Sequence, residues 1–118
     1  MSAAAEVYIT IDASQKDTWE DIELKVSENL DELGFFTKQN EHYKVGRYHS
    51  GMIIECKGYS VAYGVFLEDW AEKLVREIHA IDETTDMEVY VYNLDREADV
   101  CISSRYLFSE SHMERGSV

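Results

Sequence analysis

The sequence predicts an α+β fold in which two helices pack on one face of a largely antiparallel sheet. Strand-like segments surround two segments of helical periodicity, in the order strand, helix, strands, helix, strand, strand. That order is typical of a split βαβ (ferredoxin-like) arrangement, here with an extra C-terminal strand. The length of 118 residues suits one domain, which we place at residues 1–108, with residues 109–118 as a flexible C-terminal tail.

Composition restricts the classes of partner. The chain has 24 acidic and 11 basic residues, a net charge of −13, and 45% hydrophobic residues, which is too apolar for an acidic disordered tail. The negative charge repels phosphates and anionic lipids, so we expect neither direct nucleic-acid binding nor membrane binding. The first residues lack the basic start and apolar core of a secretory signal, so a cytoplasmic protein is expected.

The N-terminal elements are a strand and a helix. Val7, Ile9 and Ile11 alternate with polar or aromatic residues, which predicts a half-buried strand. Asp17 and Glu20 have the spacing of a capping box, and Gly34 offers a C-terminal stop, so a helix is predicted between them. Its apolar stripe recurs at helical spacing and consists of Trp19, Ile22, Val26, Leu30 and Leu33.

The remaining elements follow in order. Residues 41–64 are rich in Tyr, Val and Ile and are punctuated at Ser50-Gly51 and Lys57-Gly58, which predicts two or three antiparallel strands. Helical periodicity returns over residues 67–82. Alternating residues 88–92, a turn over residues 93–97 and a partner strand over residues 98–106 complete the pattern.

The chain carries no familiar catalytic, phosphate-binding or zinc-binding signature, so no cofactor and no metal are predicted. Cys56 and Cys101 have no metal-binding spacing and are expected to be reduced thiols. His42 and His49 would lie on opposite faces of one strand. The last predicted turn carries three carboxylates at a spacing of two residues, those of Asp95, Glu97 and Asp99. They are expected to form the turn and protect a sheet edge rather than to bind a divalent cation.

Three tyrosines are candidates for a self-association surface. If the valines and isoleucines of the first and fourth strands face the helices, then Tyr8, Tyr90 and Tyr92 point to the opposite face of the sheet. Acidic neighbours such as Glu88 argue against stacking of RNA bases on this face. Tyrosine is enriched in interface cores, so a homodimer through the sheet face is one expectation, and ordinary cross-strand tyrosine pairing is the other.

The two helices differ in how their acidic residues can be paired. In the second helix, Asp69 with Lys73 and Glu72 with Arg76 have the favourable i,i+4 order and should largely neutralise each other. The first helix gathers carboxylates on one face opposite its apolar stripe, with Lys25 as the basic neighbour at helical spacing. That face, the predicted partner-binding surface, comprises Asp17, Glu20, Asp21, Leu24, Glu28, Asp31 and Glu32.

These observations favour a non-enzymatic interaction domain whose acidic helix docks on a protein with a basic surface. Proteins that handle nucleic acids commonly have such basic surfaces. The more specific hypothesis is therefore an inhibitor that imitates nucleic-acid phosphates, of the immunity-protein or phage anti-defence type. Charge that serves only solubility is the plainer interpretation. An oligomeric small-ligand-binding or catalytic α/β domain is the alternative, and a pocket joining His42, His49 or Cys56 to carboxylates would favour it.

Overall fold

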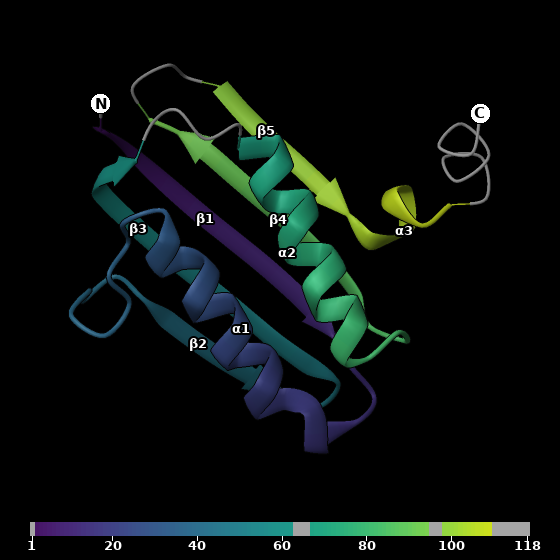
Figure 1. Cartoon of the computed structure of the whole chain (residues 1–118). Coiled ribbons are helices and arrows are strands. Elements are labelled where there is room, and N and C mark those ends of the chain that lie inside the picture. Colours follow the sequence, from purple (N-terminus) through teal and green to yellow (C-terminus); the bar gives the residue numbers. More distant parts are fainter. Residues whose placement is uncertain (1, 63–66, 95–97, 110–118) are drawn as a thin grey trace.

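The fold is α+β, as the sequence predicts (Figure 1). A computed structural model describes residues 2–62, 67–94 and 98–109. Within these residues there are three α-helices, a short 3₁₀ turn and one five-stranded sheet. The elements are β1 (Ser2–Asp12), η1 (Lys16–Thr18), α1 (Trp19–Glu32), β2 (Lys44–Tyr48), β3 (Gly51–Ala62), α2 (Leu67–Ile81), β4 (Asp86–Asn93), β5 (Ala98–Ser103) and α3 (Ser104–Leu107).

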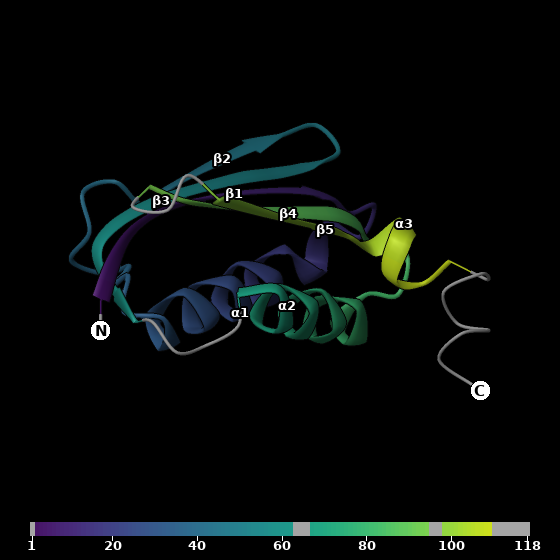
Figure 2. The same cartoon turned by 90° about the horizontal axis from the view of Figure 1, so that it is seen from above.

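The sheet has the strand order β2-β3-β1-β4-β5, and every pair of neighbours is antiparallel. Helices α1 and α2 lie side by side on one face of this sheet, while α3 lies at the end of β5 (Figure 2). The longest helix, α2, has 15 residues, and no helix in the described part of the chain is long and apolar enough to cross a bilayer. The face of the sheet opposite α1 and α2 carries no described helix.

The hydrophobic core fills the space between the two helices and the sheet. The alternation predicted for the strands is correct, since Val7, Ile9 and Ile11 on β1 and Val89 and Val91 on β4 are buried. The predicted stripe of α1 is buried as well, from Trp19 to Leu33. The buried residues of α2 are Trp70, Ala71, Leu74, Val75 and Ile78. Burial of apolar surface on this scale is the main force that holds the layers together.

The predicted start of the first helix is wrong, but its end is correct. Asp17 lies in the 3₁₀ turn η1, and Thr18 precedes the helix with no side-chain capping bond, so the capping box does not form. At the other end Gly34 has φ 93°, and the Phe35 N–H donates to the Leu30 carbonyl at 3.1 Å. This is the Schellman ending that a glycine makes accessible without steric cost.

The meander contains two strands, not three. The turn predicted at Ser50-Gly51 joins β2 to β3, and a side chain at position 51 would place Cβ 1.8 Å from the Ile11 carbonyl oxygen. The predicted break at Lys57-Gly58 is wrong, because β3 continues through it. The pairing of β1 with β3 shifts register between Gly58 and Val61, so this glycine borders a β-bulge and not a turn.

The last predicted strand ends earlier than expected. β5 stops at Ser103, whose hydroxyl accepts a hydrogen bond from the Tyr106 N–H at 3.2 Å and caps the short helix α3. The serine side chain accepts from a backbone N–H and so favours a helix start over continuation of the strand. The sequence analysis did not predict this helix. Three residues of the predicted turn (95–97) and the predicted tail beyond position 109 lie outside the described residues.

Candidate functional site

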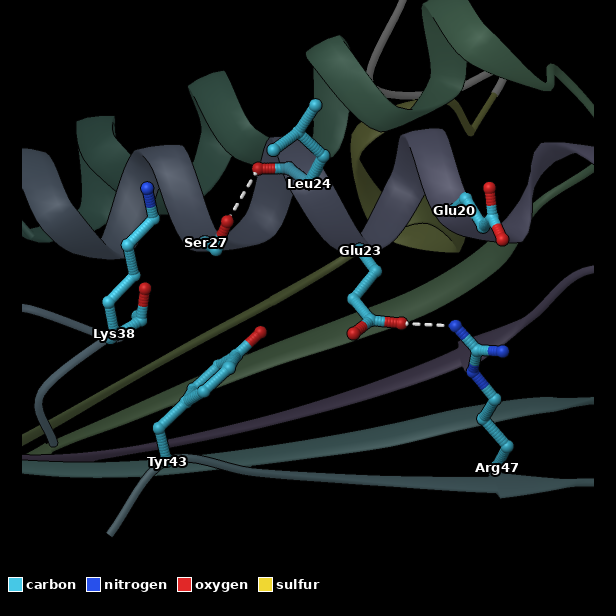
Figure 3. Close-up of a pocket in the computed structure, with 8 residues that line it drawn as sticks. Glu20, Glu23, Leu24, Ser27, Lys38, Tyr43 and Arg47 are labelled. Atoms are coloured by element: carbon cyan, nitrogen blue, oxygen red, sulfur yellow. Dashed lines mark hydrogen bonds and ion pairs between the residues drawn. The ribbon is translucent and has the colours of Figure 1, made fainter. Parts of the chain in front are cut away.

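The outer face of α1 is the candidate partner-binding surface. All seven residues predicted for it are exposed, which agrees with their position opposite the buried stripe. Leu24 is 58% exposed and points away from the sheet (Figure 3). The structure, however, divides the six carboxylates into groups with different surroundings.

Two carboxylates at the C-terminal end of α1 have structural partners. The Asp31 carboxylate accepts hydrogen bonds from the Thr37 N–H at 2.7 Å and the Thr37 hydroxyl at 2.9 Å. Glu32 lies 2.9 Å from the Lys73 ammonium on α2. Nothing local in the sequence indicates a structural role for these two acids, because their partners are brought close only by the loop after α1 and by the packing of α2.

The basic residues between the helices are also paired differently from the prediction. Lys73 forms ion pairs with Glu32 and Glu77 rather than with Asp69, and Arg76 lies 5.8 Å from the centre of the Phe108 ring. Lys25 pairs with Glu28 at 3.4 Å, not with Asp21. Lys73 thus combines a tertiary pair, with Glu32, and a different i,i+4 pair, with Glu77, while Lys25 uses an i,i+3 pair. Helical spacing does not select among such partners, since each exposed pair is worth only about 0–1 kcal/mol.

Three carboxylates remain without an ion pair to any described residue. They are Asp17 in η1 and Glu20 and Asp21 in the first turn of α1, and together with Leu24 we call them the α1 patch. The positive end of the helix dipole partly stabilises negative charge at this position. All four side chains are exposed, so the α1 patch combines unpaired negative charge with one apolar side chain.

An open groove of about 310 Å³ runs beside the α1 patch, between α1 and β2 (Figure 3). Its α1 wall carries Glu23, whose carboxylate lies 2.6 Å from the Arg47 guanidinium of β2. Tyr43 points from the sheet side toward α1, and Lys38 rises from the connecting loop. The sequence reading missed this groove, because Glu23 and Arg47 are 24 positions apart and nothing local couples them.

The Tyr43 hydroxyl is a hydrogen-bond donor in this groove. Burial, together with the negative charge of Glu23, raises the pKa of Tyr43 from 10.0 to about 12, because both disfavour the tyrosinate. The hydroxyl is therefore protonated at neutral pH. The Ser27 hydroxyl is already used, since it donates to the Leu24 carbonyl at 2.9 Å. The groove thus offers recognition by hydrogen bonding and charge rather than a nucleophile paired with a base.

The three residues named for the catalytic alternative are not brought together with one another, although His42 and Glu41 both line one open hollow. Cys56 is buried on the helix side of the sheet, and burial raises the pKa of its thiol to about 11. His42 is exposed beside Glu41, at 3.6 Å, while His49 lies in the turn after β2. Among the described residues no group of three His, Cys, Asp or Glu side chains is arranged to hold a metal ion. Cys101 is exposed on the opposite face of the sheet, and both thiols are free.

The open sheet face carries the three predicted tyrosines. Tyr8 on β1 is opposite Tyr90 on β4, with ring centres 6.4 Å apart, and Tyr92 lies next to them on β4. Tyr8 is exposed and the two β4 tyrosines are half-buried. The sequence reading missed the exposed Ile53 and Tyr59 on β3, although their alternation with the buried Met52, Ile54 and Cys56 is the signal that places them on this face.

The fold and the site define an α+β domain with an acidic helical surface. No protein-family model matches the chain, and no curated protein matches it significantly. Among solved structures, the chain is similar to the de novo designed protein Foldit4, with a TM-score of 0.50 and 15% identity over 75% of this chain and 94% of that chain. At this identity the similarity shows the fold alone.

Proposed function

We propose that this protein is a non-enzymatic interaction domain whose α1 patch docks on a basic surface of another protein. The observation that carries the proposal is the exposed Leu24 beside three carboxylates that have no ion pair with a described residue. An apolar side chain enclosed by charged groups is typical of an interface hot spot, since the rim excludes water from the central contact. Leu24 is accordingly the central contact residue.

The remaining predicted residues contribute unequally. Glu28 and Glu32 are held only by exposed ion pairs, so a basic partner can exchange with Lys25 or Lys73 at low cost. Asp31 is not available in the same way, because its carboxylate satisfies two donors of the buried Thr37. The net charge of −13 attracts a basic partner at long range and raises the rate of association.

The class of partner that best fits this surface is a nucleic-acid-handling protein. The three carboxylates of the α1 patch span four residue steps, about 6–8 Å at the rise of α- and 3₁₀-helices. Their charge density is comparable to that along one DNA strand, at about 3.4 Å per phosphate. A basic groove that binds phosphates would bind such a surface in their place. In this form the protein is an inhibitor that imitates nucleic-acid phosphates, as immunity proteins and phage anti-defence proteins do.

We propose further that the fold is a split βαβ (ferredoxin-like) arrangement extended by β5, in a cytoplasmic protein. The position of β1 between β3 and β4 supports the arrangement, as does the placement of α1 and α2 on the same face. Two free thiols, at Cys56 and Cys101, support a reducing compartment.

A homodimer through the sheet face is a second proposal, supported by a different observation. The paired rings of Tyr8 and Tyr90 lie on a sheet face that no described helix covers. Tyrosine contributes contact area with little loss of side-chain entropy. The small-ligand-binding alternative has its support in the groove beside Tyr43, although that groove opens widely to solvent.

The α1 patch can be tested with two variants of equal charge. The first carries Asp17→Asn, Glu20→Gln and Asp21→Asn on α1; the control carries Glu68→Gln, Asp69→Asn and Glu83→Gln around α2, so each changes the net charge from −13 to −10. Wild-type and variant chains are immobilised, and enrichment of basic proteins is quantified at low and high salt. Each enriched protein is then purified and titrated with the chain.

The proposal expects binding that is lost in the α1 variant and at high salt but is retained in the control. Leu24→Ala should weaken the same binding about 10-fold or more, as removal of a hot-spot residue does. Double-stranded DNA is then added as a competitor for the partner. Displacement of the chain by DNA indicates imitation of phosphates, and binding that DNA does not affect indicates docking elsewhere on the partner. Equal binding by both triple variants would show that only the total charge matters and would refute the α1 patch.

A further inference from the structure

Phe36, in the loop after α1, combines backbone strain with exposure. Its φ is 52°, and it is the one non-glycine residue in the described ranges with a positive φ. This left-handed conformation is sterically costly for a bulky side chain. The ring is nevertheless 63% exposed, so burial of apolar surface does not compensate for the strain. The Phe36 carbonyl accepts a hydrogen bond from the Gln39 N–H at 3.0 Å, but its strained backbone displays a ring that is largely exposed, which indicates a functional constraint.

The backbone on both sides of Phe36 is fixed. The preceding residue, Phe35, is buried, and the following residue, Thr37, is held by Asp31. The Asn40 side-chain amide donates to the carbonyl of Phe35 at 2.8 Å and to the carbonyl of Lys57 at 2.9 Å, which ties the loop to β3. The Phe36 ring is therefore displayed from a rigid support, which reduces the entropic cost of binding a partner.

The ring borders a hollow of about 440 Å³ between this loop and β3. Tyr59 and His42 also line it, with their rings edge to face and 6.0 Å between centres. Lys57 lies in the same hollow, with its ammonium 5.3 Å from the centre of the Tyr59 ring. The Tyr59 ring thus already holds a cation, which an incoming guanidinium would displace.

We propose that this hollow binds an arginine side chain of the basic partner, with the guanidinium stacked on the Phe36 and Tyr59 rings. A planar guanidinium stacks on aromatic faces better than an ammonium does. One carboxylate lines the hollow, that of Glu41, which lies 3.6 Å from His42 and can contact the guanidinium. Glu6 lies outside the lining and is paired with Lys57 at 3.6 Å. The net charge of −13 adds to the attraction for a cation.

This inference rests on the proposed function, because it assigns a second contact to the same partner. The loop that carries Phe36 also forms one wall of the groove beside the α1 patch, through Thr37 and Lys38. A partner docked on α1 can therefore extend along the loop to the hollow. An aromatic contact at this position would add apolar contact area to an interface in which Leu24 is otherwise the central apolar side chain.

The test uses the whole chain and a capped Gly-Arg-Gly peptide as the probe, followed by NMR of the backbone amides at neutral pH. The matched peptide carries citrulline, which keeps the planar shape of arginine and removes its charge. The protein variants are Phe36→Gly and Phe36→Asn, because glycine and asparagine both tolerate the left-handed conformation. The α1 variant described above serves as the second control.

We expect the arginine peptide to shift the amides around Phe36, His42 and Tyr59, and the citrulline peptide to leave them unchanged. Each Phe36 variant should bind the arginine peptide about two- to fivefold more weakly, as expected for loss of one cation–π contact. Its melting temperature should stay equal or rise, because glycine and asparagine relieve the backbone strain. The α1 variant should keep full affinity for the peptide, so failure of the α1 patch and failure of the hollow give different results. Absence of shifts with the arginine peptide, equal shifts with citrulline, or undiminished affinity in both Phe36 variants would overturn the inference.

Discussion

The carboxylate of Asp31, on the last turn of α1, satisfies both hydrogen-bond donors of Thr37, its backbone N–H and its hydroxyl. Thr37 is buried in the loop that leads from α1 to β2. A residue that the sequence places on an acidic, partner-binding face therefore has a structural task. The relationship shows that exposure of a carboxylate does not by itself make it available to a partner.

Asp31→Ala should destabilise the protein by about 1–3 kcal/mol, because it leaves the two buried donors of Thr37 without an acceptor. For a domain of this size that corresponds to a fall of several degrees in melting temperature. Glu28→Ala, which removes an exposed carboxylate paired with Lys25, is the control and should change stability by less than about 0.5 kcal/mol. Equal melting temperatures for the two variants would contradict the structural task assigned to Asp31.

Gly51→Ala should destabilise the protein strongly, while Gly46→Ala should be tolerated. A Cβ at position 51 would lie 1.8 Å from the Ile11 carbonyl oxygen, so the backbones of β1 and β3 must separate there. A Cβ at position 46 would lie 3.8 Å from the Ile53 carbonyl oxygen, which is an ordinary contact. We expect a loss of more than about 2 kcal/mol for the first variant in urea unfolding, as for other steric clashes in packed regions. A small loss at position 51 would show that the turn relaxes easily.

Tyr43 should make stability depend on pH in the alkaline range. Its pKa is raised by burial to about 12 in the folded protein, against 10.0 for an ordinary tyrosine. Between these values the unfolded chain loses a proton that the folded protein keeps, so the contribution of Tyr43 is complete below pH 10 and is lost as the pH rises through about 12. Unfolding measured from pH 9 to 12 should therefore show a steeper loss for wild type than for Tyr43→Phe. An equal loss of stability with pH in wild type and Tyr43→Phe would contradict the raised pKa of Tyr43.

Tyr90→Ser tests self-association through the sheet face. If the tyrosine pair mediates a dimer, sedimentation at increasing concentration should show wild type forming dimers and the variant forming fewer. Ile53→Ala lies on the same face and should have the same direction of effect, whereas Leu24→Ala on α1 should not alter the oligomeric state. A wild type that stays monomeric, or a variant with unchanged dimerisation, would remove the sheet face from the interface proposals.

Much of the fold was predictable because the signals are local. Alternation on β1 and β4 and the helical stripes of α1 and α2 place the same side chains in the core that the structure buries. Local signals also misled in three places. The Asp17 capping box, the Lys57-Gly58 break and the strand beyond Ser103 all have standard local patterns, but neighbours in space decide which hydrogen bonds form there.

The sequence by itself determined the α+β class, the buried faces and the exposed acidic side of α1, because these follow from the periods of strands and helices. Only the tertiary structure decided which charges on that side are free. Lys73 reaches Glu32, Arg47 reaches Glu23 and Thr37 reaches Asp31 because packing of α2, β2 and the loop brings distant residues together. Hydrogen bonds and ion pairs require contact within a few ångströms, and the periodicity of one helix contains no information on what lies opposite it.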